Sequence, residues 1–440
     1  MGDIAVLYAS LLITLATRYG EDFGRQFDIH LLPFSIIFLV WLVVFYITNF
    51  YDISFSKNNI QFISTLLYSI AVNAAIAAFF FYLIPLFGIA PKTNLLIFMA
   101  IATALESGWR FGFNYLLVKS GHRNNTLLIG NNSQAQELYD FLLANPQLGF
   151  HALGIIDVED QSAQQILEEL IKQKNVANII ISPSAYKIPH IVDVFYRLIG
   201  FKINFYNLSD FYERTTGRIP LGTIDQVWFL ENLSERGKRG YELSKRLLDA
   251  IFAIIIGAIT LALSPFIALA IKLDSRGPIF YRQKRTGHAS KNFELIKFRT
   301  MNQGAENKTG PIWAAESDLR ATRVGRFMRR TRIDELPQVW NILKGEMSFI
   351  GPRPERPEFY ERLHLEIPFY EARYLVKPGL LGWAQIKHKL DFRGGMTIQD
   401  TYEKLQHDLY YIKNRSFALD FGIVLKTINI LLKKTLQRTS

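Results

Sequence analysis

The sequence contains no cysteine. A disulfide framework, a thiolate nucleophile and a cysteine-based metal site are therefore all excluded. Charged residues are also scarce, because they make up 20% of the 440 residues, whereas hydrophobic residues make up 49%. This balance is apolar for a soluble protein, and the chain is long enough for two or three domains.

Several familiar catalytic and phosphate-binding patterns are missing as well. The eight histidines include no H-E-x-x-H zinc pattern, and no G-x-x-x-x-G-K-[ST] phosphate loop occurs. A dinucleotide fingerprint is incomplete, because Asn131, Asn132 and Ser133 follow Gly130 where G-x-G-x-x-G requires further glycines. We therefore expect a structural or regulatory module around Gly130, without a bound dinucleotide.

The charge that is present is mainly positive: 50 Lys and Arg face 39 Asp and Glu, a formal net charge of +11. A basic protein attracts anionic partners such as nucleic acid, acidic lipid or phosphorylated substrates. Because the charge accompanies so much apolar sequence, we expect a lipid bilayer and phosphorylated ligands as partners, and no nucleic acid.

Long hydrophobic runs concentrate in the first 120 residues, at 4–17, 31–50, 60–88 and 95–118. We predict four transmembrane helices in a domain spanning 1–120, the first of them uncleaved because no basic signal-peptide start precedes it. Glu106 and Arg110 stand one helical turn apart in the fourth run and are expected to pair.

Residues 121–235 alternate between strand-like and helix-like segments. The expected strands are 126–130, 151–157, 177–182 and 202–206, and the expected helices are 133–144, 161–173 and 189–199. Strands separated by helices favour a parallel sheet, so we predict a Rossmann-like α/β domain. Lys119, His122 and Arg123 precede it, and the positive-inside rule then places it in the cytoplasm.

A second apolar block, 247–271, lies near the start of the last predicted domain, 236–440. It is long enough to span a bilayer, but Ser264-Pro265 interrupts it, and proline kinks a helix. Basic residues flank both ends, so a full span would put one basic cluster on the trans side, against the positive-inside rule. We therefore favour a re-entrant helix broken at Ser264-Pro265 over a transmembrane span.

Two adjacent carboxylates, Asp334 and Glu335, follow a run of arginines and precede Pro337. Proline is tolerated in a first helical turn, so the pattern predicts Asp334 as an N-cap and Glu335 in the first turn. One interpretation is a plain capped helix. The other is an ionised carboxylate pair beside which arginines gather phosphate oxygens.

Basic residues in the same domain favour the second interpretation. Arg353 lies between two prolines, and a rigid turn of this kind suits bidentate binding of phosphate. Two phosphates, a divalent cation and a carboxylate pair would account for both the cations and the Asp334-Glu335 pair.

Ordered motifs between about residues 241 and 434 carry a family resemblance. They are Lys245-Arg246-Leu247-Leu248-Asp249, Ser264-Pro265, Gly277-Pro278-Ile279-Phe280-Tyr281-Arg282-Gln283, Lys297-Phe298-Arg299-Thr300-Met301, Asp334-Glu335-Leu336-Pro337-Gln338, Gly351-Pro352-Arg353-Pro354-Glu355-Arg356-Pro357 and Pro378-Gly379-Leu380-Leu381-Gly382-Trp383-Ala384-Gln385. The chain resembles the long form of the bacterial polyprenyl-phosphate glycosyl-1-phosphate transferases, a sugar transferase family. These enzymes initiate exopolysaccharide, O-antigen and capsule synthesis.

The resemblance implies a monotopic, mainly α catalytic domain, anchored by a re-entrant helix on the cytoplasmic face of the bacterial inner membrane. Such enzymes move a sugar-1-phosphate from a UDP-sugar to undecaprenyl phosphate, release UMP and need Mg2+. A hexose such as glucose or galactose is expected ahead of N-acetylated sugars. A homodimer is left open.

The resemblance also implies roles for individual residues. Asp334 matches the nucleophile that forms a phosphosugar intermediate, Glu335 matches its dyad partner, and both are expected at the Mg2+ ion. Arg353 matches a phosphate-binding arginine. Further phosphate-binding candidates are Lys297, Arg299 and Arg282. Arg332 is either another phosphate contact or a surface charge.

Two rival interpretations stay open. Tyr241 and Lys245 have the spacing of the tyrosine–lysine pair in short-chain nucleotide-sugar reductases and dehydratases, which would make the chain a membrane-tethered, NAD-binding dehydratase or epimerase. The incomplete glycine fingerprint disfavours this. The other rival is a non-catalytic scaffold for polysaccharide assembly, which the intact Asp334-Glu335 pair disfavours.

Overall fold

The computed structural model describes residues 1–83, 92–120, 124–158, 167, 169, 174–233, 236–304, 320–387 and 397–436. The chain forms two compact units, Met1–Asn207 and Leu208–Ser440. Most of the expected helix 161–173, the end of the third apolar run, and the orientation signals His122 and Arg123 lie outside the described residues.

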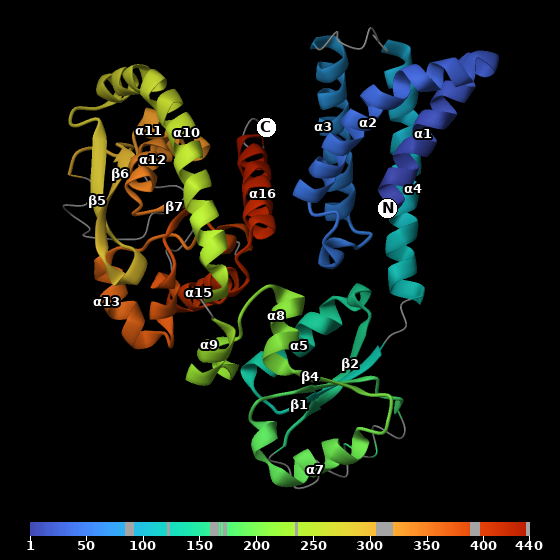
Figure 1. Cartoon of the computed structure of the whole chain (residues 1–440), viewed down its shortest axis with the longest axis vertical. Helices are drawn as coiled ribbons and strands as arrows, with labels where there is room; N and C mark the ends of the chain where they lie inside the picture. Colours follow the sequence, from blue (N-terminus) through green and yellow to red (C-terminus); the bar gives the residue numbers. More distant parts are fainter. Residues whose placement is uncertain are drawn as a thin grey trace. The chain divides into compact units, whose positions relative to one another are not determined.

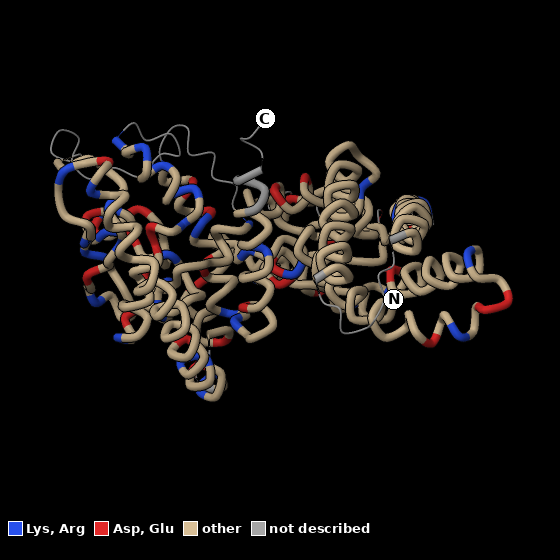
Figure 2. Tube along the Cα trace, turned by 90° about the horizontal axis from the view of Figure 1, so that it is seen from above, with Lys and Arg blue, Asp and Glu red and all other residues tan. Residues whose placement is uncertain are grey.

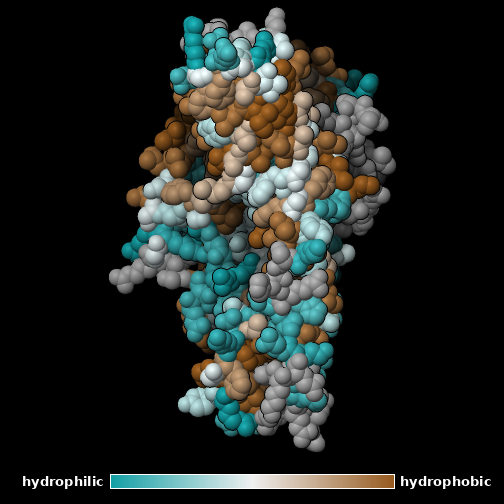
Figure 3. Space-filling view, turned by 90° about the vertical axis from the view of Figure 1, so that its right-hand side faces the viewer, coloured by the Kyte–Doolittle hydropathy of each residue, from teal (hydrophilic) through white to brown (hydrophobic). Residues whose placement is uncertain are grey.

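Four helices open the first unit, as the hydrophobic runs predict: α1 (Gly2–Tyr19), α2 (Phe23–Ile47), α3 (Ile60–Leu83) and α4 (Lys92–Ser120). Leucines of α1 and aromatic side chains of α2 and α4 form their common core. Few charges mark these helices in Figure 2, and hydrophobic residues, drawn in brown, predominate in the upper part of Figure 3. In the described part of the chain, the helical stretches 2–47, 60–82, 93–119 and 239–274 are long and apolar enough to cross a membrane.

Arg110 of α4 holds the buried charges of this bundle together. It pairs with Glu106 at 2.9 Å, as predicted, and also with Asp3 of α1 at 2.6 Å. A further guanidinium nitrogen donates to the Phe50 carbonyl oxygen at 3.2 Å. Because isolated charges are expensive inside an apolar bundle, one arginine that neutralises two carboxylates ties α1 and α4 to the segment after α2.

The second half of this unit is a four-stranded parallel sheet, which confirms the predicted α/β pattern. Its order is β2-β1-β3-β4, formed by β1 (Asn124–Ile129), β2 (Phe150–Ile156), β3 (Asn178–Ile181) and β4 (Asn204–Asn207). Helices α5 (Ser133–Ala144) and α7 (Pro189–Leu198) cover opposite faces of the sheet (Figure 1). With both faces covered, the second half of β1 (Leu127-Leu128-Ile129) and most of β3 (Ile179-Ile180-Ile181) are continuous apolar runs.

The second unit begins with α8 (Leu208–Thr216) and α9 (Gln226–Asn232), ahead of the predicted domain start at 236. Ile219, Leu221 and Ile224 pack in one core with Trp383 and Leu409, so the segment before 236 belongs physically to the C-terminal unit. The sequence missed this boundary because contacts so distant along the chain leave no local pattern.

Helices dominate the rest of the second unit, with two small sheets. The strands are β5 (Phe280–Thr286) antiparallel to β6 (Asn292–Phe298), and β7 (Ser348–Ile350) parallel to β8 (Gly379–Leu381). The helices are α10 (Arg239–Asp274), α11 (Arg323–Thr331), the 3-10 helix η9 (Ile333–Gln338), α12 (Val339–Lys344), α13 (Pro357–Glu366), η10 (Tyr370–Leu375), α14 (Trp383–Lys387), α15 (Ile398–Asn414) and α16 (Phe417–Leu436).

Helix α10 contains the second apolar block and is one helix with Pro265 inside it. Proline cannot donate to the Leu261 carbonyl four residues earlier, and the Ser264 hydroxyl donates to that oxygen instead, at 2.8 Å. Figure 1 shows α10 bending before it leads into β5. Ser264-Pro265 therefore bends the helix without ending it.

Both ends of α10 pack on the same globular body. Ala253 lies in a core with Val339 and Ile342, and Ile271 lies in another with Phe298 and Met328. Large apolar side chains between them are exposed: Leu261, Leu263, Phe266 and Leu269. The middle of α10 is thus the part of the helix that suits an apolar environment.

Replacing Arg110 tests the charge cluster of the first unit. Arg110→Ala leaves Asp3 and Glu106 without their cation, and we expect the free energy of unfolding to fall by about 3–5 kcal/mol. Unfolding in neutral detergent micelles measures this. The exposed Arg25 provides the control, since Arg25→Ala should change stability by no more than about 0.5 kcal/mol. Equal effects of the two substitutions would contradict a stabilising role for the cluster.

Candidate functional site

The carboxylate pair lies in η9, not at the cap of an α-helix. Arg332 occupies the N-cap position of η9 with a left-handed backbone (φ 57°), and Asp334 and Glu335 form its first turn. The predicted N-cap role of Asp334 is therefore wrong, because the chain reverses at Arg332 and leaves the Asp334 side chain out of the capping position. Both carboxylates are nevertheless almost fully buried, at 7% and 6% exposure.

Glu335 is held by three cations, all of them predicted site residues. Its Oε1 accepts from Arg353 at 2.6 Å and from Lys297 at 3.1 Å, and its Oε2 lies 3.4 Å from Arg332. Burial alone would raise the pKa of Glu335, but Arg353, Lys297 and Arg332 together hold it well below its usual value. Glu335 is thus a permanent anion that gathers three cations at one point.

The cations are more open than the carboxylate beneath them. The Glu335 side chain is 8% exposed, whereas those of Lys297, Arg332 and Arg353 are 19%, 34% and 34% exposed. A second anion can therefore reach the cations from the solvent side without displacing Glu335. Guanidinium groups held in this way suit phosphate oxygens.

Asp334 behaves differently from its neighbour. Its carboxylate makes no hydrogen bond to any other described residue. Burial and the adjacent Glu335 raise its pKa, Lys297 opposes them, and the result is a pKa of about 6. At neutral pH the group is mostly ionised, yet it is a stronger base than an ordinary aspartate. It is an unengaged anion beside a cluster of cations.

Arg353 owes its position to a second, deeper cluster of charges. An Arg373 guanidinium nitrogen donates to the Arg353 carbonyl oxygen at 2.9 Å and to the Asp408 carboxylate at 2.9 Å. Both side chains of that ion pair are 2% exposed. Because Arg373 lies on η10 and Asp408 on α15, two distant elements fix the backbone that carries Arg353.

Glu355 and Arg285 hold the same turn from its other side. Lys404 of α15 donates to the Glu355 carboxylate, and Arg285 donates to the Pro354 carbonyl oxygen at 3.1 Å. Burial opposes ionisation of Glu355, but Lys404, Arg373 and Arg285 lower its pKa to about 2. The turn between the prolines is therefore fixed by cations, Lys404, Arg373 and Arg285, that lie outside the motif itself.

Arg282 and Arg299, two of the predicted phosphate ligands, do not contact Asp334 or Glu335. Arg282 pairs with Glu294 at 3.0 Å, with both side chains more than half exposed. In the β5–β6 register Arg282 faces Ile296, whereas Tyr281 faces Lys297, so Arg282 lies on the opposite face of the hairpin from Lys297. The same alternation puts Arg285 on the Lys297 face, which makes it the site residue that the sequence interpretation missed.

Arg299 ties the end of α10 to β6. It donates to the Ser275 carbonyl oxygen at 2.8 Å and to the Ser275 hydroxyl at 2.9 Å. Gly277 has φ +127°, and a Cβ there would lie 2.0 Å from an Arg299 nitrogen, so only glycine lets the chain pass over this guanidinium. Arg299 holds the scaffold of the site instead of touching the dyad.

The site fits Mg2+ only when a bound phosphate supplies part of the oxygen ligands. Among the described residues no group of three or more His, Asp and Glu side chains could hold a metal ion. The oxygens of Glu335 already face three cations, so Asp334 is the open carboxylate. Mg2+ is commonly bound by one or two carboxylates together with substrate phosphates and water, and this donor set can satisfy it once a phosphate is bound.

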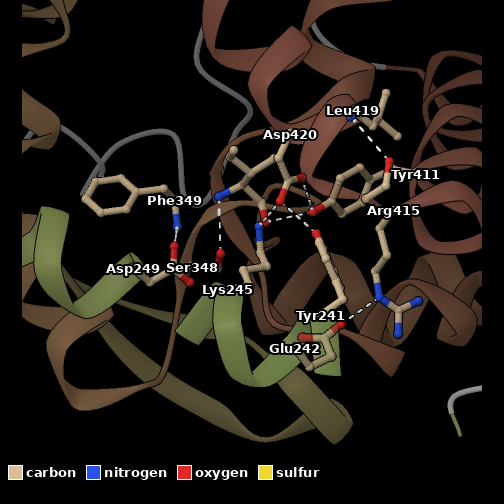
Figure 4. Close-up of polar contacts among 12 residues, drawn as sticks. Tyr241, Glu242, Lys245, Asp249, Ser348, Phe349, Tyr411, Arg415, Leu419 and Asp420 are labelled. Carbon is tan, nitrogen blue, oxygen red and sulfur yellow. Dashed lines mark hydrogen bonds and ion pairs between the residues drawn. The ribbon is translucent and has the colours of Figure 1, made fainter. Parts of the chain in front are cut away.

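The Tyr241 and Lys245 pair has a structural role. Both side chains donate to Asp420 Oδ2 at 2.7 Å, and Tyr411 donates to Oδ1 at 2.9 Å (Figure 4). These contacts join α10 to α15 and α16. A tyrosine and a lysine anchored on one buried carboxylate do not form the catalytic pair of a dehydratase.

The turn after β1 also lacks the form of a dinucleotide site. The Asn132 side chain accepts from the Ala135 N–H at the start of α5 and donates to Ser182 at 2.9 Å. The helix N-terminus that would receive a pyrophosphate is thus capped by the protein itself. At Gly130 a Cβ would lie 2.6 Å from the Cβ of Ser182, so the turn packs directly on the residue that follows β3.

The fold and site together define a membrane-associated protein with a carboxylate–cation centre suited to phosphate groups. Residues 240–434 match the bacterial sugar transferase family. A UDP-glucose:undecaprenyl-phosphate glucose-1-phosphate transferase of Caulobacter vibrioides is 38% identical over 49% of this chain and 79% of its own. A putative undecaprenyl-phosphate N-acetylgalactosaminyl 1-phosphate transferase of Bacillus subtilis is 50% identical over 32% of this chain and 78% of its own. The chain belongs to the bacterial sugar transferase family.

Longer relatives match over part of their length. A UDP-N-acetylgalactosamine-undecaprenyl-phosphate N-acetylgalactosaminephosphotransferase of Aeromonas hydrophila is 41% identical over 52% of each chain. This chain spans between half and three fifths of the first curated relatives it matches.

Neutralising Asp334 and neutralising Glu335 should change the free energy of unfolding in opposite directions. Asp334 has a raised pKa of about 6 in the folded protein, so its charge opposes folding above that pH. Asp334→Asn removes this charge and should add about 1–3 kcal/mol to the free energy of unfolding at pH 8. The gain should disappear near pH 4, where both folded and unfolded wild type approach protonation. Unfolding in detergent across this pH range measures it.

Glu335→Gln should do the reverse. The low pKa of Glu335 means that its stabilisation is present above the unfolded pKa and is lost as pH falls through the folded value. Removing its charge leaves Lys297, Arg332 and Arg353 facing one another, and the free energy of unfolding should fall by about 2–4 kcal/mol at pH 8. If both substitutions destabilise the protein equally at every pH, the electrostatic description of the dyad is wrong.

Proposed function

We propose that this protein transfers a sugar-1-phosphate from a UDP-sugar to a polyprenyl phosphate, with undecaprenyl phosphate as the acceptor. UMP is released, and the product is a polyprenyl-diphosphate-sugar, the starting lipid of an exopolysaccharide, O-antigen or capsule. One observation carries the proposal: an unengaged carboxylate, Asp334, beside a glutamate that concentrates three cations. Membership of the sugar transferase family and the names of the relatives support the same reaction class.

Asp334 acts as the nucleophile in this proposal. One of its carboxylate oxygens attacks the sugar-proximal phosphorus of the UDP-sugar, the bond from that phosphorus to the bridging oxygen breaks, and UMP leaves with the electron pair. A phosphate oxygen of the polyprenyl phosphate then attacks the aspartyl phosphosugar and restores the Asp334 carboxylate. The covalent step separates the aqueous donor from the lipid acceptor in time.

The cations make the approach of one anion to another feasible. Arg353 and Lys297 bind the diphosphate oxygens and neutralise charge that would repel the Asp334 carboxylate, and Arg332 is close enough to join them. Glu335 holds these three cations in place, and Arg373 and Arg285 fix the turn that carries Arg353. Mg2+, held by Asp334 and substrate phosphates, would supply further charge neutralisation.

The membrane arrangement supports the same reaction. The Ser264-Pro265 bend and the packing of both ends of α10 on one globular body favour a re-entrant helix over a span. We infer that the site lies on the cytoplasmic face of the bacterial inner membrane, where a UDP-sugar is soluble and a polyprenyl phosphate presents its head group. Helices α1 to α4 would form a multi-pass anchor.

The sugar stays open between hexoses and N-acetylated hexosamines. Relatives are named for glucose and for N-acetylgalactosamine, so similarity does not separate the two. Glucose or galactose remains our expectation for this chain, and a screen of UDP-sugars decides it.

UMP release tests the proposed reaction. Membranes that contain the protein should release UMP from one UDP-sugar when undecaprenyl phosphate is added. Asp334→Asn should lower this rate on the order of 10³-fold or more, since the nucleophile is lost. Asp210 is exposed on α8, and Asp210→Asn should match the wild type. Full activity of Asp334→Asn would rule out the covalent mechanism, and no UMP release with any UDP-sugar would rule out the function.

The natural absence of cysteine gives a clean test of the topology. Gly237→Cys and Arg276→Cys each place one thiol at an exposed flank of α10. A re-entrant helix predicts that a membrane-impermeant maleimide labels both variants in inside-out vesicles and neither in intact spheroplasts. Labelling of Arg276→Cys only in spheroplasts would show a transmembrane span.

A further inference from the structure

A charged recess lies in the second unit at the N-terminal part of α10. It is a small recess of about 30 Å3 that is partly open to solvent, and neither Asp334 nor Glu335 lines it. Its charged lining residues are Glu242, Lys245, Arg246, Asp249, Lys377 and Arg415. Figure 4 shows part of this surrounding, where α10 meets the strand β7 and the ends of α15 and α16.

Two of the cations have carboxylate partners. Lys245 pairs with Asp420 at 2.7 Å, and Arg415 pairs with Glu242 at 2.6 Å. These pairs fasten α10 to the helices behind it and neutralise that side of the recess. They leave Arg246 and Lys377, with Asp249 as the only lining carboxylate outside the pairs.

Arg246 and Lys377 have no carboxylate partner among the described residues. Arg246 donates to the Ile342 and Leu343 carbonyl oxygens at 2.5 and 2.7 Å, which are neutral acceptors at the end of α12. Lys377 makes no hydrogen bond or ion pair with another described residue. Asp249 accepts from the Phe349 N–H at 3.2 Å and so serves the backbone of β7.

The two cationic groups border the same small space. Gly345 ends α12 with φ +82°, and a Cβ placed on it would lie 3.4 Å from Arg246 Nη2 and 3.6 Å from Lys377 Nζ. Burial lowers the pKa of Lys377 and Arg246 lowers it further, whereas the more weakly acting Asp249 and Glu242 raise it. Two like charges at one glycine repel each other, and a bound anion would relieve that repulsion.

The surroundings indicate which anion fits. Leu243 and Leu247 flank Arg246 along α10 and are 76% and 63% exposed. They begin the exposed apolar surface of a helix that is long and apolar enough to enter a bilayer. Cations next to exposed leucines, at the start of a helix that can enter a bilayer, suit an amphiphile with an anionic head and an apolar tail.

We propose that Arg246 and Lys377 form a second phosphate site, separate from the Asp334-Glu335 dyad, which binds the phosphate head group of an anionic membrane lipid. The site would fix the depth of α10 in the membrane surface. A free phosphate ion has the same chemistry, so the test must separate the two sources. Lipid binding at Arg246 and Lys377 would occur whether or not Asp334 and Glu335 transfer a sugar phosphate.

Binding to the purified full-length protein in neutral detergent tests the site. Dodecyl phosphate, inorganic phosphate and dodecanol are titrated separately, by native mass spectrometry or calorimetry. Lys377→Gln removes one cation and no described contact, and we expect it to weaken one dodecyl phosphate binding event about tenfold. Lys291 is an exposed lysine between β5 and β6, and Lys291→Gln should bind as the wild type does.

Each outcome decides the proposal. Weakened dodecyl phosphate binding in Lys377→Gln, with unchanged unfolding and weak binding of dodecanol and inorganic phosphate, supports a lipid head-group site. Equal affinity for inorganic phosphate and dodecyl phosphate overturns the lipid assignment. Dodecyl phosphate binding to Lys377→Gln that equals the wild type overturns the site. If Lys377→Gln unfolds more easily, Lys377→Arg should restore binding, and failure to do so also overturns it.

Discussion

The proposed chemistry of this protein depends on one buried glutamate that holds three cations. Glu335 accepts from Arg353 and Lys297 and lies beside Arg332, and without that anion the three positive groups would repel one another. The arrangement concentrates positive charge at one point while the neighbouring Asp334 stays free of hydrogen bonds. Adjacent carboxylates in one turn thus differ in their electrostatic surroundings, because, among the described residues, Glu335 contacts three cations and Asp334 contacts none.

The rest of the second unit serves to keep this cluster in place. The β5–β6 hairpin supplies Lys297, and Arg299 ties that hairpin to the end of α10. The Arg373–Asp408 pair, buried behind the site, fixes the backbone of Arg353. Because these supports come from segments far apart in sequence, the site can form only after the unit has folded.

Patterns with a local cause could be read from the sequence. Hydrophobic runs predicted the four N-terminal helices and α10, alternation predicted the parallel sheet, and helical spacing predicted the Glu106–Arg110 pair. Asp3, the second partner of Arg110, could not be predicted, because only tertiary packing brings α1 to α4. The cap at Asp334 was mispredicted, because a left-handed Arg332 and a 3-10 turn replaced the expected helix start.

The candidate site was predicted in outline for a similar reason. Motif positions identified the dyad, Lys297, Arg332 and Arg353, which the structure brings together. They also suggested Arg282 and Arg299, which it does not, because strand alternation turns Arg282 to the other face of the hairpin and Arg299 fixes the end of α10. That same alternation could have pointed to Arg285, whereas Arg373 and Asp408 carry no local signal at all.

Direct detection of the covalent intermediate tests the central claim most sharply. Purified protein is mixed with its UDP-sugar in the absence of polyprenyl phosphate, and its intact mass and peptides are measured. The account predicts one sugar phosphate attached to Asp334, which disappears when polyprenyl phosphate is added. Substrate turnover without any adduct, or an adduct on another residue, would contradict it.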